Sequence, residues 1–202
     1  MTLSNAVALP GGGSHALALT QDKLVVAWGN NAFGQLNVPP GLSNLVGIAA
    51  GYEHSLALKS DGTVAAWGAG TFNGSSPNHG QSMVPTNLSQ VMAIAAGGYH
   101  SLALLTNGTV VAWGDRTLGQ ANVPPGLTNI MAIAGGGYHS LALRNDGTVV
   151  AWGAGTNYRL PFNFGQSLVP TNLNQVVAID AGLYHSAALL SNGTVVVWGD
   201  GR

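Results

Sequence analysis

GGYHSLAL occurs at residues 97–104 and again, unchanged, at 136–143. Variants of the same motif stand at 52–58 (YEHSLAL), at 183–189 (LYHSAAL) and at 13–19 (GSHALAL). Each copy has one histidine, which a tryptophan follows by 13 residues, and both recur at alternating steps of 39 and 46 residues. A period near 40 residues is typical of stacked repeat architectures. The histidines are His15, His54, His100, His139 and His185, and the tryptophans are Trp28, Trp67, Trp113, Trp152 and Trp198.

Every repeat contains short apolar segments. In the third copy four of them can be distinguished. Segment A is VMAIAAG (91–97), segment B is HSLAL (100–104), segment C is VVAWG (110–114) and segment D is QANVP (120–124). Each segment is bounded by Gly, Asn, Asp or Pro and is too short for a helix, which predicts strands. An Asn-Gly or Asp-Gly pair separates B from C in four copies, and such pairs favour tight hairpins. The pattern predicts an all-β chain, a β-propeller of four-stranded antiparallel blades with five repeat units.

The order of the strands within a blade follows from side-chain chemistry. Segment D carries a proline, and because proline lacks the N–H group that a central strand needs, we expect D at the outer edge. Segment A is rich in small residues, which suits strands that line a narrow central channel. We expect a single domain over 1–202, with units at about 3–41, 42–87, 88–126, 127–172 and 173–202, the last without its outer strand.

Five repeats leave three alternatives for the closure of the ring. The chain is a piece of a longer propeller, a self-closed five-bladed ring, or part of an assembly that is completed between chains. Self-association through unclosed edge strands belongs to the third alternative, because an unpaired strand edge can pair with another chain.

The composition excludes several classes of function. Only 6% of the residues are charged and the formal net charge is −1, so we expect no binding of nucleic acid. No apolar run approaches the roughly 20 residues of a membrane span, so we expect no membrane insertion. The absence of cysteine removes disulfides and thiolate metal sites. The N-terminal residues lack a positively charged region, so we expect no signal peptide in this chain.

The repeated histidines and serines do not predict an enzyme or a metal site. Equivalent histidines of different blades lie too far apart to share one metal ion, so we expect them to tie loops to backbone. Adjacent Ser and His on one strand point to opposite faces, and no acid recurs to orient a base. Asp61 and Asp146 take the repeat position of Asn107 and Asn192, which marks them as turn residues. We expect no catalytic residues, no metal and no cofactor.

The loops vary most from copy to copy. Because strand direction alternates, the loops between A and B and between C and D are expected on the same face. The insert after Trp-Gly has four residues at 30–33 and 115–118 and eleven at 69–79 and 154–164. Variable loops on a rigid scaffold commonly carry function, and aromatic side chains anchor protein interfaces. The candidate partner-binding residues are Tyr52, Glu53, Tyr99, Tyr138 and Tyr184 before strand B, and Phe72, His79, Tyr158, Arg159, Phe162 and Phe164 in the long inserts.

The motifs AIAAGGYHSLAL, DGTVVAWG and GQ…VP resemble those of the regulator-of-chromosome-condensation repeat family over essentially the whole chain. The short period is similar to the bacterial branch of that family, which includes a secreted β-lactamase-inhibitor propeller. The resemblance implies a β-propeller, usually seven-bladed, that serves as a protein-binding scaffold, here in an extracellular or cell-surface bacterial setting. In that inhibitor, aromatic residues before strand B contact the partner enzyme. The matching positions here are Tyr52, Tyr99, Tyr138 and Tyr184, flanked by Glu53 and Leu183.

The function that we expect is non-enzymatic binding of a protein partner through the face of the A–B and C–D loops. Nothing here matches the wedge insertion of nucleotide-exchange members of the family, so exchange activity is not expected. Two alternatives remain: a lectin-like or small-ligand-binding propeller with sites repeated between blades, and a structural module of a longer extracellular repeat protein.

Overall fold

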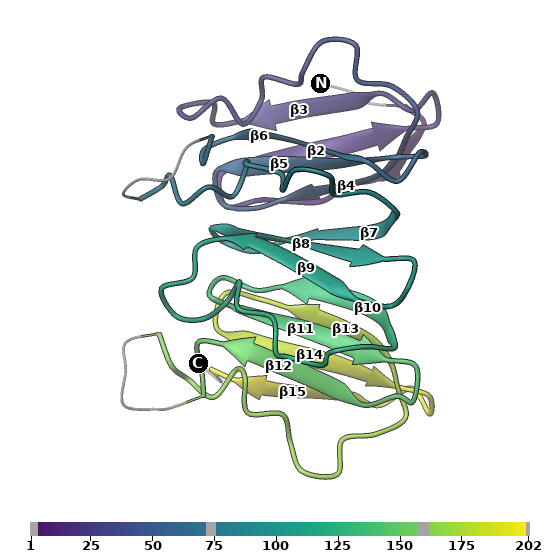
Figure 1. The fold of residues 1–202 in the computed structure, drawn as a ribbon, viewed down its shortest axis with the longest axis vertical. Coiled ribbons are helices and arrows are strands. Elements are labelled where there is room, and N and C mark those ends of the chain that lie inside the picture. Colours follow the sequence, from purple (N-terminus) through teal and green to yellow (C-terminus); the bar gives the residue numbers. More distant parts are fainter. Residues whose placement is uncertain (1–3, 72–75, 157–161, 201–202) are drawn as a thin grey trace.

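The computed structural model describes residues 4–71, 76–156 and 162–200. They form five antiparallel sheets of three strands each, which follow one another along the chain (Figure 1). The all-β prediction and the five repeat units are confirmed. Within the ranges given, no helix has the length and apolar character needed to cross a membrane.

Every sheet has the same order, with the strand of segment B in the middle. The inner strands, from segment A, are β1 (Ala6–Ala8), β4 (Leu45–Ala50), β7 (Val91–Ala96), β10 (Ile130–Gly135) and β13 (Val176–Ala181). The middle strands are β2 (His15–Thr20), β5 (His54–Lys59), β8 (His100–Leu105), β11 (His139–Arg144) and β14 (His185–Leu190). The third strands, from segment C, are β3 (Val25–Gly29), β6 (Val64–Gly68), β9 (Val110–Gly114), β12 (Val149–Gly153) and β15 (Val195–Gly199).

Tight turns join the middle strand to the third strand, as the Asp-Gly and Asn-Gly pairs predict. In the second sheet, Asp61 Oδ1 accepts hydrogen bonds from the N–H and the hydroxyl of Thr63, and Gly62 has φ of 78°. Asn107 accepts the same two bonds from Thr109 in the third sheet. The turn needs only a side-chain oxygen, so Asp and Asn are interchangeable there.

Segment D forms no strand in the part of the chain that the structure describes, so the predicted four-stranded blade is wrong. At 120–124 the backbone turns instead, and the N–H of Asn122 donates to the carbonyl of Gly119. Pro124 lacks an N–H group that could donate to a neighbouring strand, and the carbonyl of Gln120 is occupied by groups of the next sheet. The segment therefore joins two sheets and does not extend its own.

Apolar side chains from both sheets fill the space between each pair of consecutive sheets. Between the second and third sheets, Leu56 and Leu58 pack with Trp113 in one buried cluster. Equivalent clusters fill the other three interfaces. Trp67, Trp113 and Trp152 are only 4–5% exposed, which confirms the predicted packing role of the tryptophan in segment C.

One backbone carbonyl links each pair of consecutive sheets. The carbonyl oxygen of Gln81 accepts hydrogen bonds from Trp113 Nε1 (2.8 Å) and Ser101 Oγ (2.9 Å), both of the next unit. A carbonyl oxygen has two lone pairs, so these two donors use its full capacity. The same pair of bonds reaches Gln35, Gln120 and Gln166 from the unit that follows each of them.

The repeated histidine completes this contact. His54 Nε2 lies 3.0 Å from Ser101 Oγ. Because the serine donates its one hydroxyl proton to the Gln81 carbonyl, His54 Nε2 must be the donor in its bond to the serine. The network therefore assigns the tautomer with the proton on Nε2, and the buried Nδ1 has no hydrogen-bond partner. We call the group of Gln carbonyl, Trp Nε1, Ser Oγ and His Nε2 the carbonyl latch.

The prediction that the histidines tie loops to backbone is wrong. The latch histidines bond to a serine of the next unit and so tie neighbouring sheets together. The pairs across the other three interfaces are His15–Ser55, His100–Ser140 and His139–Ser186.

A glycine three residues before the latch histidine leaves room for the imidazole ring. A Cβ on Gly97 would lie 2.1 Å from His100 Cε1 and 2.6 Å from the carbonyl oxygen of Gly136 in the next unit. Gly51 and its own histidine show the same close approach. The close fit of ring and backbone therefore excludes any side chain here.

The outer faces of the first and last sheets are exposed. Trp28 is 37% exposed, unlike Trp67, Trp113 and Trp152, and Val195 and Val197 of the last sheet are 61% and 60% exposed. A self-closed five-bladed ring would cover both faces. The described residues therefore form an open row of sheets, in which each sheet packs on the next (Figure 1).

Gly97→Ala should lower the free energy of unfolding by about 3 kcal/mol, because the added methyl group overlaps the His100 ring and the backbone of the next unit. Urea denaturation followed by circular dichroism measures the loss. Gly11→Ala is the control, since no atom lies within 4 Å of a Cβ at that position. Equal stability of the two variants would contradict the fit of the ring against Gly97.

Mild acid should destabilise the fold. Burial, and secondarily the charge of neighbouring histidines, lowers the pKa of His54 and His100 to about 3 and that of His139 to about 4. The unfolded chain has histidine pKa values of about 6.5, so it binds more protons than the folded chain below that pH. The stabilisation is complete above about pH 6.5 and declines toward pH 4, by at most about 1.4 kcal/mol per pH unit for each histidine.

Urea midpoints measured between about pH 7.5 and pH 4.5 test this decline. Asp61 and Asp146 interfere little in that window, because hydrogen bonds from Thr63 and Thr148 lower the pKa of each carboxyl. His100→Gln should give a flatter dependence on pH than the wild type. The same slope in both proteins would exclude His100 as a source of the acid sensitivity.

Candidate functional site

The A–B and C–D loops lie together at one end of the sheets, which we call the loop face. In the second unit, the N–H of Ala69 in the C–D insert donates to the carbonyl of Glu53 in the A–B loop (2.7 Å). Ala154 and Tyr138 make the same bond in the fourth unit (2.9 Å). These backbone bonds hold the side chains of both loops at a fixed place on the sheet end.

Seven rings of the loop face form one continuous cluster, the aromatic array. Its members are Tyr52, Tyr99, Tyr138, Tyr184, Phe162, Phe164 and His79. The centroids of neighbouring rings lie 4.8–6.5 Å apart, within the range in which aromatic pairs attract one another. Tyr138, Phe162 and Tyr184 are nearly parallel, with interplanar angles of 8–19°. The array joins loops from four of the five units.

Tyr52 is not equivalent to the other three tyrosines, although the sequence prediction groups them. It stands one repeat position earlier, where the next two units have Gly98 and Gly137. A Cβ on Gly98 would lie 2.7 Å from Tyr52 Cε2, and a Cβ on Gly137 would lie 2.7 Å from Tyr52 Oη. The Tyr52 ring therefore crosses over two neighbouring loops, and glycine leaves the space. The Tyr52 ring meets the Tyr99 ring edge-on, with the two ring centroids 5.1 Å apart.

A cavity of about 240 Å³ lies among the inner strands and the A–B loops. Tyr52 and Leu183 line it with their side chains, and all of its other lining residues are glycine or alanine. This agrees with the prediction that small residues of segment A face a narrow channel. Tyr52 contributes at once to the wall of this cavity and to the aromatic array.

The long insert of the fourth unit is held at its base by side-chain amides. Gly155 N–H donates to Asn163 Oδ1, and Gln166 Nε2 donates to the carbonyl of Phe162 (2.6 Å). Equivalent bonds hold the long insert of the second unit. Phe162 has φ of 66°, a conformation that favours glycine, and its ring stacks on Tyr138 at 4.8 Å. The ring is nevertheless 42% exposed.

Seven of the eleven predicted partner-binding residues belong to the array. Glu53 does not, because its carboxylate accepts hydrogen bonds from Gln35 Nε2 (2.5 Å) and Ser14 Oγ (3.1 Å) of the first unit. Its role is to satisfy groups at the first sheet interface. Three predicted residues lie outside the described part of the chain: Phe72, Tyr158 and Arg159.

Asp115 is a residue of the loop face that the sequence prediction missed. Its buried carboxylate accepts hydrogen bonds from Gln120 Nε2 (2.7 Å) and the N–H of Thr117 (2.9 Å). In the long inserts a backbone carbonyl, such as that of Pro77, accepts the equivalent amide proton. The short insert of the third unit uses the carboxylate of its first residue, Asp115, instead. Its short length is the feature of the sequence that could have indicated this role.

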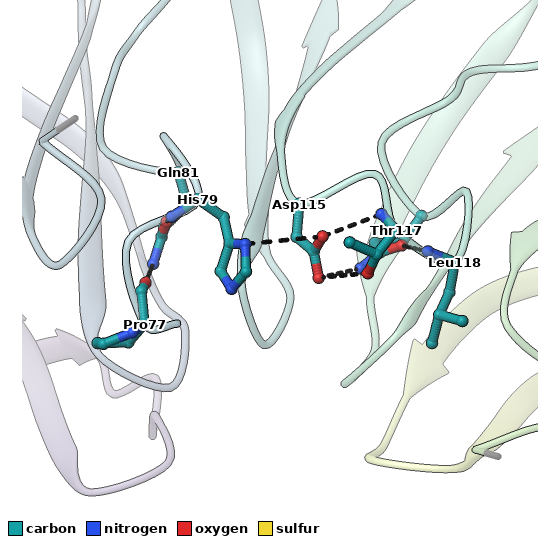
Figure 2. Close-up of polar contacts among 7 residues, drawn as sticks. Pro77, His79, Gln81, Asp115, Thr117 and Leu118 are labelled. Atoms are coloured by element: carbon teal, nitrogen blue, oxygen red, sulfur yellow. Dashed lines mark hydrogen bonds and ion pairs between the residues drawn. The ribbon is translucent and has the colours of Figure 1, made fainter. Parts of the chain in front are cut away.

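His79 faces Asp115 across a groove between the second and third units. Figure 2 shows the imidazole directed at the carboxylate, with His79 Nδ1 3.8 Å from Asp115 Oδ1. The groove has a volume of about 530 Å³ and is also lined by Met83, Trp113 and Arg116. It borders the aromatic array, since the His79 ring is a member.

The array offers neutral hydroxyl groups. Burial raises the pKa of Tyr52 and Tyr138, and the neighbouring tyrosines raise both further. Both phenols are therefore uncharged at physiological pH. Amphipathic rings of this kind combine a large apolar area with groups that donate and accept hydrogen bonds, which suits contact with another protein.

The geometry of the described residues bears on two kinds of site, a metal site and that of a serine hydrolase. No three His, Asp or Glu side chains among them lie close enough to hold one ion. The latch serines are buried at the sheet interfaces, and the histidine donates its proton to the serine. A serine hydrolase needs the opposite direction of transfer, from serine to histidine.

The family model of the regulator of chromosome condensation (RCC1) repeat matches five segments of the chain, at residues 6–35, 45–74, 91–120, 131–159 and 176–202. A search of curated protein sequences gave no significant match. Each matched segment contains one of the repeated histidines and the tryptophan that follows it.

Solved structures share the arrangement of sheets. Prp20p from Saccharomyces cerevisiae is 26% identical with a TM-score of 0.77, over 96% of this chain and 57% of that chain. The receptor kinase CR4 ectodomain from Physcomitrella patens is 26% identical with a TM-score of 0.75, over 96% and 51%. Human WBSCR16 is 26% identical with a TM-score of 0.69, over 93% and 60%. This chain thus spans between half and two thirds of each relative, and it belongs to the regulator of chromosome condensation (RCC1) repeat family.

Proposed function

We propose that the chain is a non-enzymatic scaffold that binds a protein partner through the aromatic array of its loop face. The observation that carries the proposal is the continuity of seven rings from four units on one face. Tyrosine and other aromatic residues are enriched among the residues that dominate protein interfaces. The rings already pack on one another, so a partner would order few further side chains on binding.

The relatives support protein binding in general terms. Prp20p has been studied for its binding to Gsp1p and histones, and a further structure holds yeast RCC1 with Kap60. This chain spans 57% of Prp20p, and its own partner is a separate question. The bacterial, extracellular setting and the similarity to a β-lactamase-inhibitor propeller stay predictions from the resemblance.

The loop face favours one macromolecular partner over a set of repeated ligand sites. A lectin-like propeller with sites between blades needs the same polar residues in every loop. Here the inserts match only in alternate units, and their aromatic side chains merge into one surface.

Alanine at Tyr99, Tyr138 and Tyr184 together should weaken partner binding at least about 100-fold, because it removes three central rings of the array. The partner is first captured by the wild type, identified and purified, and its affinity for each variant is then measured by calorimetry. Val195→Ala, on the exposed outer face of the last sheet and outside the array, is the control and should bind as the wild type does. An unchanged affinity of the folded triple variant would sink the proposal.

Phe162→Gly should weaken the same binding about tenfold or more while the protein keeps its stability. Glycine adopts the φ of 66° without strain, which offsets the stacking lost against Tyr138. Thermal unfolding and calorimetry on the same preparation separate the two effects. A melting temperature lower by more than about 5 °C with unchanged affinity would assign Phe162 to packing of the insert alone.

A further inference from the structure

A bulge in each inner strand exposes one apolar side chain. The pairing of inner and middle strands shifts register after the first residue of β4, β7, β10 and β13, and within β1. A β-bulge redirects the extra residue that it contains. The residues at this position are Val7, Val46, Met92, Met131 and Val177, which we call the apolar row. All five are between 49% and 55% exposed.

The apolar row lies at the end of the sheets opposite to the loop face. Met92 and Met131 line a groove of about 490 Å³ together with Asn107 and Asn145 of the hairpin turns. The middle strand runs from the A–B loop to this turn, so the two ends of the molecule are separated by the full length of the sheets. We call this end the turn face.

The charged side chains of the turn face balance one another. Its acids are Asp22, Asp61 and Asp146, and its bases are Lys23, Lys59 and Arg144. A surface for anionic membranes or nucleic acid would carry an excess of cations, which this face lacks. Acids and bases interleaved in equal number are complementary to the same face of a second copy, where each acid can meet a base.

We propose that the turn face is the contact surface between two copies of this chain related by a two-fold axis, in which each copy covers the apolar row of the other. A contact of this symmetry uses the same patch twice, so it needs a patch that complements itself. Five half-exposed apolar side chains stand at equivalent positions at one end of the sheets, and two of them share a groove. Exposed apolar patches are common at protein interfaces. The arrangement leaves the two loop faces directed outward, so the pair would present two aromatic arrays.

Sedimentation velocity of the wild type between about 1 and 100 μM tests the proposal, with a concentration-dependent dimer as the expected result. Met92→Glu with Met131→Glu should raise the dissociation constant at least about 100-fold, because like charges then face each other across the axis. Met83→Glu is the matched control, since Met83 is similarly exposed but lines the groove of the loop face. That variant should dimerise as the wild type does.

Lys59→Glu with Arg144→Glu tests the charge argument without touching the apolar row. It makes the turn face acidic, so it should weaken the dimer at low salt and less at high salt. A wild type that stays monomeric at about 100 μM overturns the proposal. The proposal is also overturned if Met83→Glu weakens the dimer as much as the double methionine variant does. The same holds if the dimer is dissociated only by Val197→Lys, on the exposed last sheet.

The two proposals fail separately. A variant with both methionines replaced that is monomeric, folded by circular dichroism and still able to bind the protein partner assigns dimerisation to the turn face and binding to the loop face. If the tyrosine triple variant loses partner binding but still dimerises, only the proposal for the loop face is affected.

Discussion

Each interface between sheets depends on one glutamine carbonyl that accepts two hydrogen bonds. The carbonyl must point away from its own sheet, and the side chain of the same glutamine sets that direction. Gln81 Oε1 accepts the N–H of His79, and Gln81 Nε2 donates to the carbonyl of Pro77. The side-chain amide of each of the four glutamines is buried, so its Nε2 group needs an acceptor close by. In the second, third and fourth units the insert before the glutamine supplies that acceptor, as a backbone carbonyl or as the Asp115 carboxylate. In the first unit Glu53 of the next unit supplies it.

The sheets and the carbonyl latches form the frame of the molecule. The loop positions that this frame leaves free carry the aromatic array. The glycine three residues before the latch histidine is required by the imidazole ring, but the residue directly before that histidine is not constrained by the latch. Tyrosine stands there in three units, and in the second unit Glu53 stands there and serves the interface, while Tyr52 has moved one position earlier. The aromatic array and the frame therefore share the same short loops, and neighbouring residues serve different purposes.

The sequence predicts the parts of the fold that arise from local pattern. Strand positions, hairpin turns and the interface tryptophan follow from periodicity and from Asn-Gly and Asp-Gly pairs. Segment D was misassigned because an apolar run that ends in proline resembles an edge strand, whereas its glutamine carbonyl is committed to the next sheet. The latch was invisible for a related reason. Its glutamine, serine and tryptophan keep separations of 20 and 32 residues at every interface, but spacing alone does not say which groups bond. The membership of the array could be predicted, while the crossing of Tyr52 over its neighbours depends on glycines of two other units.

The latch also separates the growth of the loops from the stability of the frame. The bonded histidine and serine are 40 residues apart at two interfaces and 47 at the other two, yet the bond lengths stay at 2.8–3.0 Å. Seven additional residues are thus accommodated outside the sheets with no change in how the sheets meet. An insertion or deletion in the gene at this point would reshape the loop face and leave the sheet interfaces intact. Under the proposed function, evolution of loop length alone would change the surface that is offered to a partner.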